Sequence, residues 1–367
     1  MAHVAADVVT TRALNRALLA RQLLLDRADL PVLGAVHHLV GLQAQLPLNP
    51  YVGLWSRLAG FRADELAGLL VDRRVVRLVL MRATIHLVTA EDCLAIRPLV
   101  QPVLDAELAR HAELGPHLVG VDLEPVLAFA RPLLAERPRT GAELRAAMAE
   151  RFPDLHPGAL AYACRNRLAA VQVPPRGVWG RTGQVALTTA EAWLGRPLAE
   201  RPSIDDVVLR YLAAFGPAAP ADVAAWSRLT GMRAVLDRLR PRLRPFRDER
   251  GRELLDLPDA PRPDPATPAP PRFLPEFDNV VLSHADRTRV MADDDRRRLF
   301  GPGLPVRGLV LVDGFARASW AVEGDALVVR SAGPLTGDER DDVAAEGARL
   351  LAFLGAAATD VRFEPAG

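Results

Sequence analysis

The sequence contains no lysine, because all 46 of its basic residues are arginine. This absence excludes several kinds of chemistry. A Walker-type phosphate-binding loop needs a lysine, and a Schiff base or a serine–lysine nucleophile needs a lysine amine. The abundance of arginine, alanine, leucine, valine and proline is the composition that a GC-rich genome produces, and we favour that explanation over selection for bidentate arginine contacts. Any chemistry must use arginine, carboxylate, histidine or neutral amide groups.

Cysteine, excess charge and long hydrophobic runs are also scarce. Cys93 and Cys164 lie far apart and match no metal-ligand spacing, so we expect no zinc site and no cofactor. With 46 basic and 45 acidic residues, only local arginine clusters could attract nucleic acid. No apolar run approaches the roughly 18 residues of a membrane span, and the N-terminus does not resemble a signal peptide. We therefore expect a cytoplasmic protein with no membrane partner.

The order of predicted elements indicates an α+β fold with repeated units. At 367 residues the chain is long for one core and fits two or three domains. Between residues 204 and 257, three amphipathic helices are separated by glycine or proline stops and followed by two strands that could pair as a hairpin across residues 248–251. Three helices followed by a hairpin is the order of a winged helix.

The same order is predicted twice upstream. Residues 124–170 contain three helical segments, capped in one case by Thr140, and strands follow at 171–174 and 184–188. Helical segments between residues 12 and 70 likewise precede strands at 75–80 and 85–88. A proline-rich linker from Pro258 to Arg272 is followed by mostly β sequence and one helix at 338–353. We expect three tandem winged helices in residues 1–115, 116–200 and 201–260, and a β-barrel-like C-terminal element in 261–367.

A pair of glutamines, Gln43 and Gln45, lies in a segment that reads GLQAQLPLNPY from Gly41. In an α-helix these two side chains would lie about 200° apart. Pro47 and Pro50 favour a non-helical backbone, in which both can share a face. A carboxamide oxygen can accept a hydrogen bond from water and present partial negative charge to a developing cation. The pair is therefore a candidate for holding a nucleophilic water.

These glutamines stand with four other motifs: RATIHLV from Arg82, YLAAFGP from Tyr211, FLPEFDNV from Phe273 continuing through SHADR from Ser283, and VDGF from Val312. Together they span nearly the whole chain, and the sequence resembles the AlkZ/YcaQ family of winged-helix DNA glycosylases. In that family the second position of the glutamine motif is Gln in AlkZ-like members and Asp in YcaQ-like members, so Gln45 resembles the AlkZ branch.

The resemblance implies a C-shaped stack of three winged helices completed by a β-barrel-like element. It also implies hydrolysis of the N-glycosidic bond of bulky cationic N7-alkylguanine adducts in duplex DNA, which in some relatives gives self-resistance to a DNA-alkylating antibiotic. Such a base already carries positive charge and leaves as a neutral molecule, so a general acid is less needed. The catalytic residues are then Gln43 and Gln45, with Asn49, Thr84 and His86 as possible support. Because lysine is absent, we expect a monofunctional enzyme that leaves an abasic site.

Candidate DNA-binding residues form three groups. Residues 233–247 contain six arginines and one acid, Asp237. This segment either binds DNA phosphates or is a solvated arginine-rich face. Arg82 lies near the glutamines. At the predicted wing tip, Trp179 stands between two arginines and is expected to pack against its hairpin rather than to wedge between bases. The candidates are Arg82, Arg176, Trp179, Arg181, Arg233, Arg240, Arg242 and Arg244.

Two other residues have competing interpretations. His86 shares a strand face with Thr84 and either supports the active site or is satisfied by a backbone carbonyl. Asp286 is expected to form a structural pair with Arg287 or Arg289.

Two alternatives to a glycosylase remain open from the sequence. A non-catalytic winged-helix regulator would bind undamaged DNA in a sequence-specific way, usually as a dimer. A sequestering protein would bind the free alkylating molecule. The glutamine pair favours the enzyme, because a repressor has no need of it away from its recognition helix. No dimerisation heptad is present, so we expect a monomer.

Overall fold

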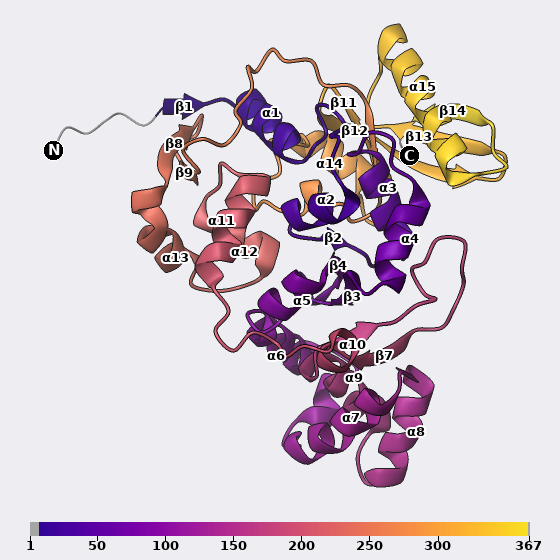
Figure 1. Ribbon diagram of the computed structural model, residues 1–367. Coiled ribbons are helices and arrows are strands. Elements are labelled where there is room, and N and C mark those ends of the chain that lie inside the picture. Colours follow the sequence, from indigo (N-terminus) through magenta and orange to yellow (C-terminus); the bar gives the residue numbers. More distant parts are fainter. Residues whose placement is uncertain (1–6, 366–367) are drawn as a thin grey trace.

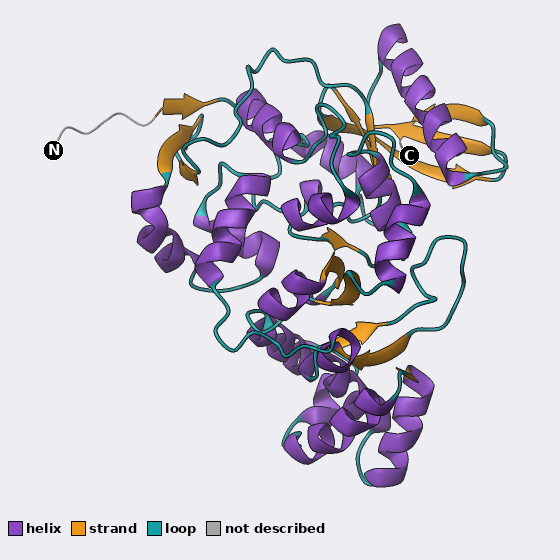
Figure 2. Ribbon diagram, viewed as in Figure 1, coloured by secondary structure: helices purple, strands orange, loops and turns teal. Residues whose placement is uncertain are grey.

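The computed structural model describes residues 7–365 and has a mixed α+β fold with three sheets (Figures 1 and 2), which confirms the predicted class. The α-helices are α1 (Thr11–Arg21), α2 (Val32–His38), α3 (Asn49–Trp55), α4 (Ala63–Val71), α5 (Ala90–Ile96), α6 (Gln101–Arg110), α7 (Glu124–Glu136), α8 (Gly141–Arg151), α9 (Pro157–Arg167), α10 (Ala190–Leu194), α11 (Ile204–Phe215), α12 (Pro220–Ser227), α13 (Met232–Leu239), α14 (Asp293–Leu299) and α15 (Gly337–Leu354). The strands are β1 (Asp7–Val9), β2 (Leu42–Gln43), β3 (Val75–Val79), β4 (Ile85–Thr89), β5 (Arg139–Thr140), β6 (Ala170–Gln172), β7 (Ala186–Thr189), β8 (Arg244–Asp248), β9 (Glu253–Asp256), β10 (Arg272–Leu274), β11 (Gly308–Val312), β12 (Phe315–Glu323), β13 (Ala326–Ser331) and β14 (Asp360–Pro365).

One order of elements occurs three times: a helix, a short strand, two helices and a hairpin whose second strand pairs with the short strand. The first repeat is α2, β2, α3, α4, β3 and β4, with β2 against β4. The second is α7, β5, α8, α9, β6 and β7, with β5 against β7. In the third, α11 to α13 precede β8 and β9, and a bridge from Ala218 to Leu255 takes the place of the short strand. The predicted helices and hairpins are therefore present, whereas α5, α6, α10 and, in the C-terminal part, α14 were not predicted.

Local signals explain where several of these helices begin. Thr140 caps α8 as predicted, and Glu143 completes a capping box with it. Ser203 caps α11, whose first turn carries Asp205 and Asp206 near the positive end of the helix dipole. These caps stabilise the helices that the sequence pattern indicated.

The first two repeats share a sheet. β3 of the first repeat pairs with β6 of the second, so their strands form one six-stranded sheet in the order β2-β4-β3-β6-β7-β5. The third repeat has its own sheet, in which β1 adds to β8 in parallel. Figure 1 accordingly shows α2 to α4 in the middle of the molecule, α7 to α9 below them and α11 to α13 to one side.

The prediction of a barrel-like C-terminal element is wrong, because the five-stranded sheet β10-β11-β12-β13-β14 is open. Its edge strands, β10 and β14, pair only with their inner neighbours within the described residues. α15 connects β13 to the parallel strand β14 and packs on strands from both ends of the sheet, where it contacts β10, β11 and β14. The helix thus covers the apolar face that closure would otherwise have to bury.

The proline-rich segment before this sheet has neither helix nor strand, as predicted, but it is held in place. Nε of Arg16 in α1 donates to the Thr267 carbonyl at 2.6 Å, and Nε of Arg21 donates to the Pro261 carbonyl at 3.2 Å. Arg21 also forms a buried pair with Asp256 of β9 at 2.6 Å. The segment is therefore a strap over α1.

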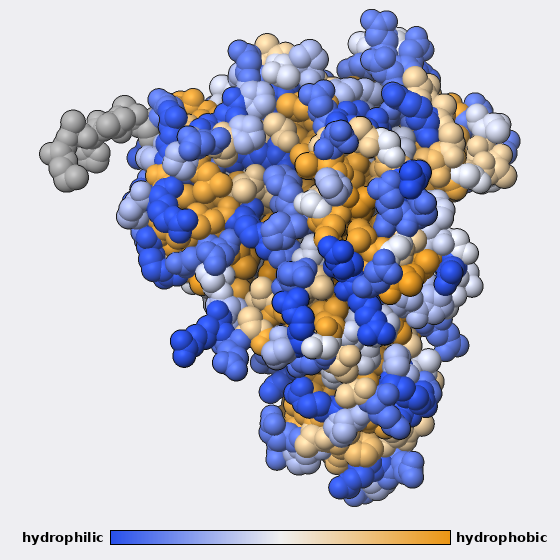
Figure 3. Space-filling view, in the orientation of Figure 1, coloured by the Kyte–Doolittle hydropathy of each residue, from blue (hydrophilic) through white to orange (hydrophobic). Residues whose placement is uncertain are grey.

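The largest apolar core joins the third repeat to the central sheet. Tyr211 of α11 lies 5.0 Å from Trp226 of α12 and 5.2 Å from Phe215, measured between ring centroids. In the space-filling view, apolar side chains show among the hydrophilic ones, most clearly down the middle of the molecule (Figure 3). This packing fixes the C-terminal end of α12 close to the hairpin of β3 and β4.

Candidate active site

Gln43 lies in an extended segment, as predicted, and its side chain is only 7% exposed. β2 pairs antiparallel with β4, so that Gln43 stands opposite His86. Its carboxamide oxygen accepts a hydrogen bond from Nη2 of Arg82 at 2.7 Å. The carboxamide therefore has a fixed orientation, with one lone pair of its oxygen already used.

Gln45 has a different environment, because its side chain is exposed. Its carboxamide oxygen accepts the Ile85 backbone N–H at 3.2 Å. Between the two glutamines, Ala44 is tied down on both sides: its N–H donates to the Ile85 carbonyl at 2.7 Å and its own carbonyl accepts from Arg77 at 2.8 Å. The structure thus places both glutamines against the turn between β3 and β4.

Arg82 is the centre of this arrangement. It lies in the β3–β4 turn with a left-handed φ of 57°, and this conformation directs its side chain at Gln43. Besides Gln43, Nη2 lies 3.3 Å from Nε2 of His86 and 3.3 Å from the Asn279 side-chain oxygen, while Nη1 donates to the Trp226 carbonyl at 2.6 Å. All four acceptors are neutral. Desolvation, followed by repulsion from Arg228 and Arg287, lowers the pKa of Arg82 to about 10, so it is still a cation at neutral pH.

His86 is fully buried and has a partner on each ring nitrogen. Nδ1 lies 3.0 Å from the Thr84 carbonyl, which can only accept, and Nε2 faces the donor Arg82. Burial, reinforced by Arg82, lowers the pKa of His86 to about 3. The ring is therefore neutral with its proton on Nδ1, and it cannot act as an acid or base near neutral pH. Thr84 itself donates from Oγ1 to the Met81 carbonyl at 3.2 Å and stabilises the turn.

Sequence reasoning did not single out the segment after β10 as part of the site. Asn279 bridges the glutamine strand and Arg82, because its amide nitrogen donates to the Gly41 carbonyl at 3.0 Å. The preceding residue, Asp278, forms a buried bidentate pair with Arg57 at 2.8 and 2.9 Å. Asn49 also contacts this segment, with its amide on the Glu276 carbonyl at 2.7 Å. The FLPEFDNV motif was visible in the sequence, but nothing in it indicated which strand it would meet.

Comparison with known proteins identifies the family. The family model described as "DNA glycosylase AlkZ-like" matches residues 36–353. The chain belongs to the AlkZ-like DNA glycosylase family. Among solved structures, DNA glycosylase AlkZ of Streptomyces sahachiroi is similar, with a TM-score of 0.79 and 19% sequence identity over 97% of this chain and 100% of that one. No curated protein matches. The AlkZ-like fold therefore extends over almost the whole chain.

The predicted wing-tip residues of this AlkZ-like chain lie in the loop between β6 and β7. Trp179 packs against other side chains, as expected, but the partners are Tyr51 of α3 and Phe353 of α15, with centroids 5.0 and 5.3 Å away, rather than its own hairpin. Its backbone N–H donates to the Tyr51 hydroxyl at 3.1 Å. Arg181 is exposed, whereas Arg176 is partly buried and donates to the Gly183 carbonyl at 3.3 Å. The loop is therefore docked on the first repeat and on α15.

A glycine allows that loop to approach a buried arginine of β3 closely. Gly177 has a φ of 87°, and a Cβ there would come within 2.9 Å of the Arg77 side chain. Arg77 is 1% exposed and has no carboxylate partner within residues 7–365; its Nε and Nη1 have no hydrogen-bond partner there. Desolvation, with a smaller contribution from Arg176, lowers its pKa to about 10. Arg77 thus links the Ala44 carbonyl to the underside of this loop.

Three of the six arginines of residues 233–247 form ion pairs. Arg240 pairs with Glu253, and Arg244 pairs with Asp7, each at 2.6 Å. Arg238 pairs with Asp205. Arg233 and Arg242 have no ion pair within the part of the chain that the structure describes. The cluster is therefore less basic than its sequence indicates.

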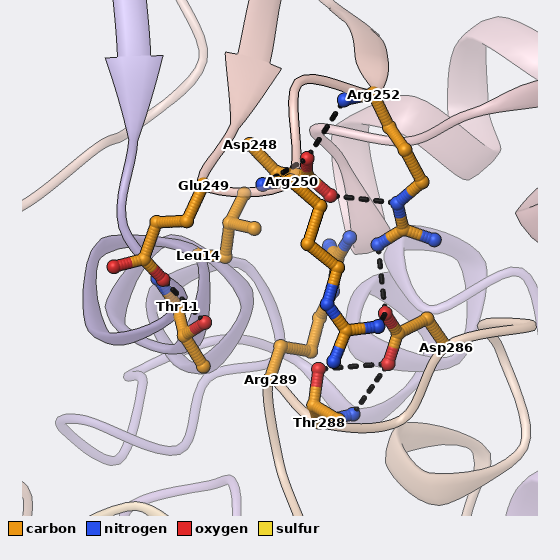
Figure 4. A pocket seen from close by; sticks show the side chains of 9 residues that line it. All are labelled: Thr11, Leu14, Asp248, Glu249, Arg250, Arg252, Asp286, Thr288 and Arg289. Carbon is orange, nitrogen blue, oxygen red and sulfur yellow. Dashed lines mark hydrogen bonds and ion pairs between the residues drawn. The ribbon is translucent and has the colours of Figure 1, made fainter.

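Asp286 has a structural role, but not with the predicted partners. Its carboxylate accepts from Arg250 at 3.1 Å, from Arg252 at 2.8 Å and from the Thr288 hydroxyl at 2.7 Å (Figure 4). Arg289 instead donates to the Pro217 carbonyl at 2.8 Å. The pairing crosses from the C-terminal segment to the β8–β9 turn, a long-range contact that neighbouring residue types cannot predict.

Within residues 7–365, no cluster of three or more His, Cys, Asp and Glu side chains is suited to holding a metal ion. No helix in that range has the length and apolar character needed to cross a membrane. The groups that meet around the glutamines are the carboxamides of Gln43, Gln45 and Asn279, the partly buried guanidinium of Arg82 and the neutral ring of His86.

Proposed function

We propose that this chain is a monofunctional DNA glycosylase that hydrolyses the N-glycosidic bond of bulky cationic N7-alkylguanine adducts in duplex DNA. The observation that carries the proposal is the placement of Gln43 and Gln45 together against the β3–β4 turn in a chain of the AlkZ-like DNA glycosylase family. A role in self-resistance to a DNA-alkylating antibiotic is consistent with the resemblance, and the protein acts as a monomer.

The two glutamines have different roles in this proposal. Gln45 is exposed and its oxygen makes one weak backbone contact, so a second lone pair can accept a hydrogen bond from the attacking water. Gln43 is held by Arg82, and its remaining lone pair and amide group orient the water and the sugar. Neither side chain is a base near neutral pH. Their contribution is the fixed placement of dipoles around a cationic transition state.

His86 and Asn49 are positioning residues in this mechanism, as is Thr84. His86 accepts from Arg82 and so helps to fix the guanidinium that holds Gln43. Asn49 holds the segment that carries Asn279. A neutral histidine suits a site that admits a cationic base, because an imidazolium would repel it.

We further propose that the three repeats are winged helices in residues 1–115, 116–200 and 201–260, arranged as a C around the duplex, with residues 261–367 completing the protein. The recurring order of elements supports this division. Among the predicted DNA contacts, Arg181, Arg233 and Arg242 are the exposed arginines without an ion pair within residues 7–365, whereas Arg82 and Arg176 are unpaired but partly buried. Arg240 and Arg244 pair with acids and contribute less.

The experiment is incubation of the wild type and the Gln45→Ala variant with duplex DNA carrying a bulky N7-alkylguanine, followed by detection of free base and alkali-sensitive abasic sites. We expect release by the wild type and a rate about 10²-fold lower in the variant, the magnitude that loss of one catalytic hydrogen-bonding group costs. Borohydride should trap no covalent DNA complex, because no lysine amine is present and only the α-amino group remains to form an imine. Retained DNA binding without release from any of several adducts would favour a non-catalytic regulator, and tight binding of the free alkylating molecule would favour a sequestering protein.

A further inference from the structure

The glutamine segment is held by two arginines that approach from opposite faces of the six-stranded sheet. Arg82 binds the side chain of Gln43. Arg77 of β3 binds the backbone instead, because its Nη2 donates to the Ala44 carbonyl at 2.8 Å. β2 and β3 both pair with β4 in a register that puts Gln43 on the face of Leu78, the residue next to Arg77. Since successive side chains alternate between faces, Arg77 lies on the other face.

The Ala44 carbonyl controls where the Gln45 side chain begins. It belongs to the planar peptide unit that ends at the Cα of Gln45. The preceding peptide is fixed as well, because the Ala44 N–H donates to the Ile85 carbonyl at 2.7 Å. The exposed Gln45 side chain has only its contact at 3.2 Å to hold it. Its placement therefore depends on the peptide that Arg77 binds.

The stability of the fold does not explain why a buried arginine performs this task. Within residues 7–365, Arg77 has no acidic partner, and its Nε and Nη1 have no hydrogen-bond partner. A buried cation without an acid destabilises a folded protein. Two other buried arginines of this chain do have acids, because Arg21 pairs with Asp256 and Arg57 with Asp278. Arg77 thus lowers stability at the position that fixes the glutamine segment.

The loop between β6 and β7 encloses this arginine. A Cβ at Gly177 would come within 2.9 Å of Cδ and 3.0 Å of Nη1 of Arg77, so the loop backbone lies directly on the guanidinium. The Tyr51 hydroxyl fastens the loop there, since it donates to the Gly177 carbonyl at 2.8 Å and accepts the Trp179 N–H at 3.1 Å. A hydrogen bond that is shielded from water in this way is stronger than an exposed one.

We propose that Arg77 is a positioning residue for Gln45, and that the β6–β7 loop of the second repeat completes the active site of the first by enclosing Arg77. This inference rests on the proposed function and deepens it. Arg77 acts through the Ala44 carbonyl and contacts neither the DNA nor the attacking water. The site gains a fixed Gln45, while the fold loses stability to an unpaired charge.

The first test separates positioning from a structural role. The variants Arg77→Met and Arg77→Lys are compared with the wild type on duplex DNA carrying an N7-alkylguanine. We expect Arg77→Met to lower kcat about 10-fold or more and to leave KM within about 3-fold, because only the geometry of the reaction changes. Arg77→Lys keeps a donor for the carbonyl and should recover part of the lost rate. The urea midpoint of Arg77→Met should not fall below that of the wild type, because the variant removes an unpaired buried charge.

A matched pair of glycine variants tests the loop. Gly177 and Gly180 lie in the same loop with φ of 87° and 69°, so alanine is strained at both positions. Only at Gly177 would the new Cβ meet Arg77, because nothing lies within 4 Å of a Cβ at Gly180. We expect Gly177→Ala to lower kcat as Arg77→Met does, and Gly180→Ala to keep a kcat close to that of the wild type. This pair also replaces the first test if Arg77→Met does not fold.

Amide hydrogen exchange over residues 41–48 measures the same effect without catalysis. Exchange should be faster in Arg77→Met and Gly177→Ala than in the wild type and Gly180→Ala. The positioning role is overturned if Arg77→Met keeps the kcat or the exchange of the wild type, if it only lowers the urea midpoint, or if the two glycine variants lose kcat equally. A wild type that releases no base refutes the glycosylase, but faster exchange in Arg77→Met would still retain Arg77 as the residue that fixes the glutamine segment.

Discussion

At the scale of single residues, the two glutamines of one motif have different physical roles. Gln43 is buried and accepts from the partly buried guanidinium of Arg82, whereas Gln45 is exposed and makes one contact at 3.2 Å. Loss of activity in a variant has a different meaning at each position. Under the proposed function, at Gln45 it would report on the chemistry, while at Gln43 it would also report on the position of Arg82.

This difference predicts unequal effects on stability. Gln43→Ala removes the shortest acceptor of Nη2 of the buried Arg82 and should lower the free energy of unfolding by about 1–3 kcal/mol. Gln45→Ala should change it by less than about 0.5 kcal/mol, because the side chain is exposed. Urea unfolding of both variants at pH 7 measures the two values. Equal losses would mean that Gln43 is not held by Arg82 in solution.

The sequence could predict the extended backbone of this motif, because Pro47 and Pro50 exclude a helix, but not its partners. Arg82 reaches Gln43 only because the turn before β4 adopts left-handed backbone at two successive non-glycine residues, Arg82 and Ala83. Non-glycine residues seldom adopt positive φ, so the residue types in this turn do not predict its conformation. Asn279 arrives from 236 positions further along the chain than Gln43, and only the folded structure brings it there.

At the scale of elements, the packing of the loop between β6 and β7 bears on the role of Trp179, which either packs against neighbouring side chains or wedges between bases. Trp179 contacts Tyr51 and Phe353, and the Tyr51 hydroxyl both accepts from Trp179 and donates to the Gly177 carbonyl at 2.8 Å. The loop therefore has its own packing partners, and the partly buried Trp179 ring contacts two other aromatic side chains, which favours a packing role over a wedge between bases.

Trp179→Ala should accordingly lower the free energy of unfolding by about 2–4 kcal/mol, slightly less than the loss expected for a fully buried tryptophan. The affinity of this variant for an abasic-site duplex should stay within about 2-fold of the wild-type affinity. Trp179→Phe keeps most of the apolar contact and serves as the control, with a smaller loss of stability. Unfolding in urea and fluorescence anisotropy give the two quantities. A large loss of DNA affinity at unchanged stability would instead support a wedge between bases.

Elements were more predictable than the way they join. Caps such as Thr140 and stops such as Gly216 and Gly231 are local signals, so the helices and hairpins of the three repeats could be predicted to within a few residues. The pairing of β3 with β6, which merges two repeats into one sheet, depends on residues about 95 positions apart and leaves no local pattern. The open C-terminal sheet has the same cause, since it differs from a barrel in the pairing of its edge strands β10 and β14, which local sequence does not indicate.

At the scale of the whole molecule, two fully buried histidines link stability to pH. The ring of His86 lies between the Thr84 carbonyl and Arg82. Nε2 of His284 lies 3.0 Å from the Phe215 carbonyl oxygen, which is an uncharged partner. Burial is the main cause that lowers the pKa of each to about 3. The first histidine belongs to the proposed active site and the second to the packing of α11 and α12 beside it, so protonation of either destabilises the same region.

The sign of this effect follows from proton linkage. Between pH 7 and pH 5 the unfolded chain protonates both histidines, whose ordinary pKa is about 6.5, while the folded protein keeps them neutral, so folding stability falls as the pH falls. The loss at pH 5 is about 2 kcal/mol for each histidine, or about 4 kcal/mol together. Urea unfolding at the two pH values measures this, and calorimetry at pH 5.5 in buffers of different ionisation enthalpy should detect uptake of about two protons on unfolding. His284→Asn should reduce that uptake to about one whatever its effect on stability at pH 7, and an unchanged uptake would mean that His284 is already protonated in the folded protein.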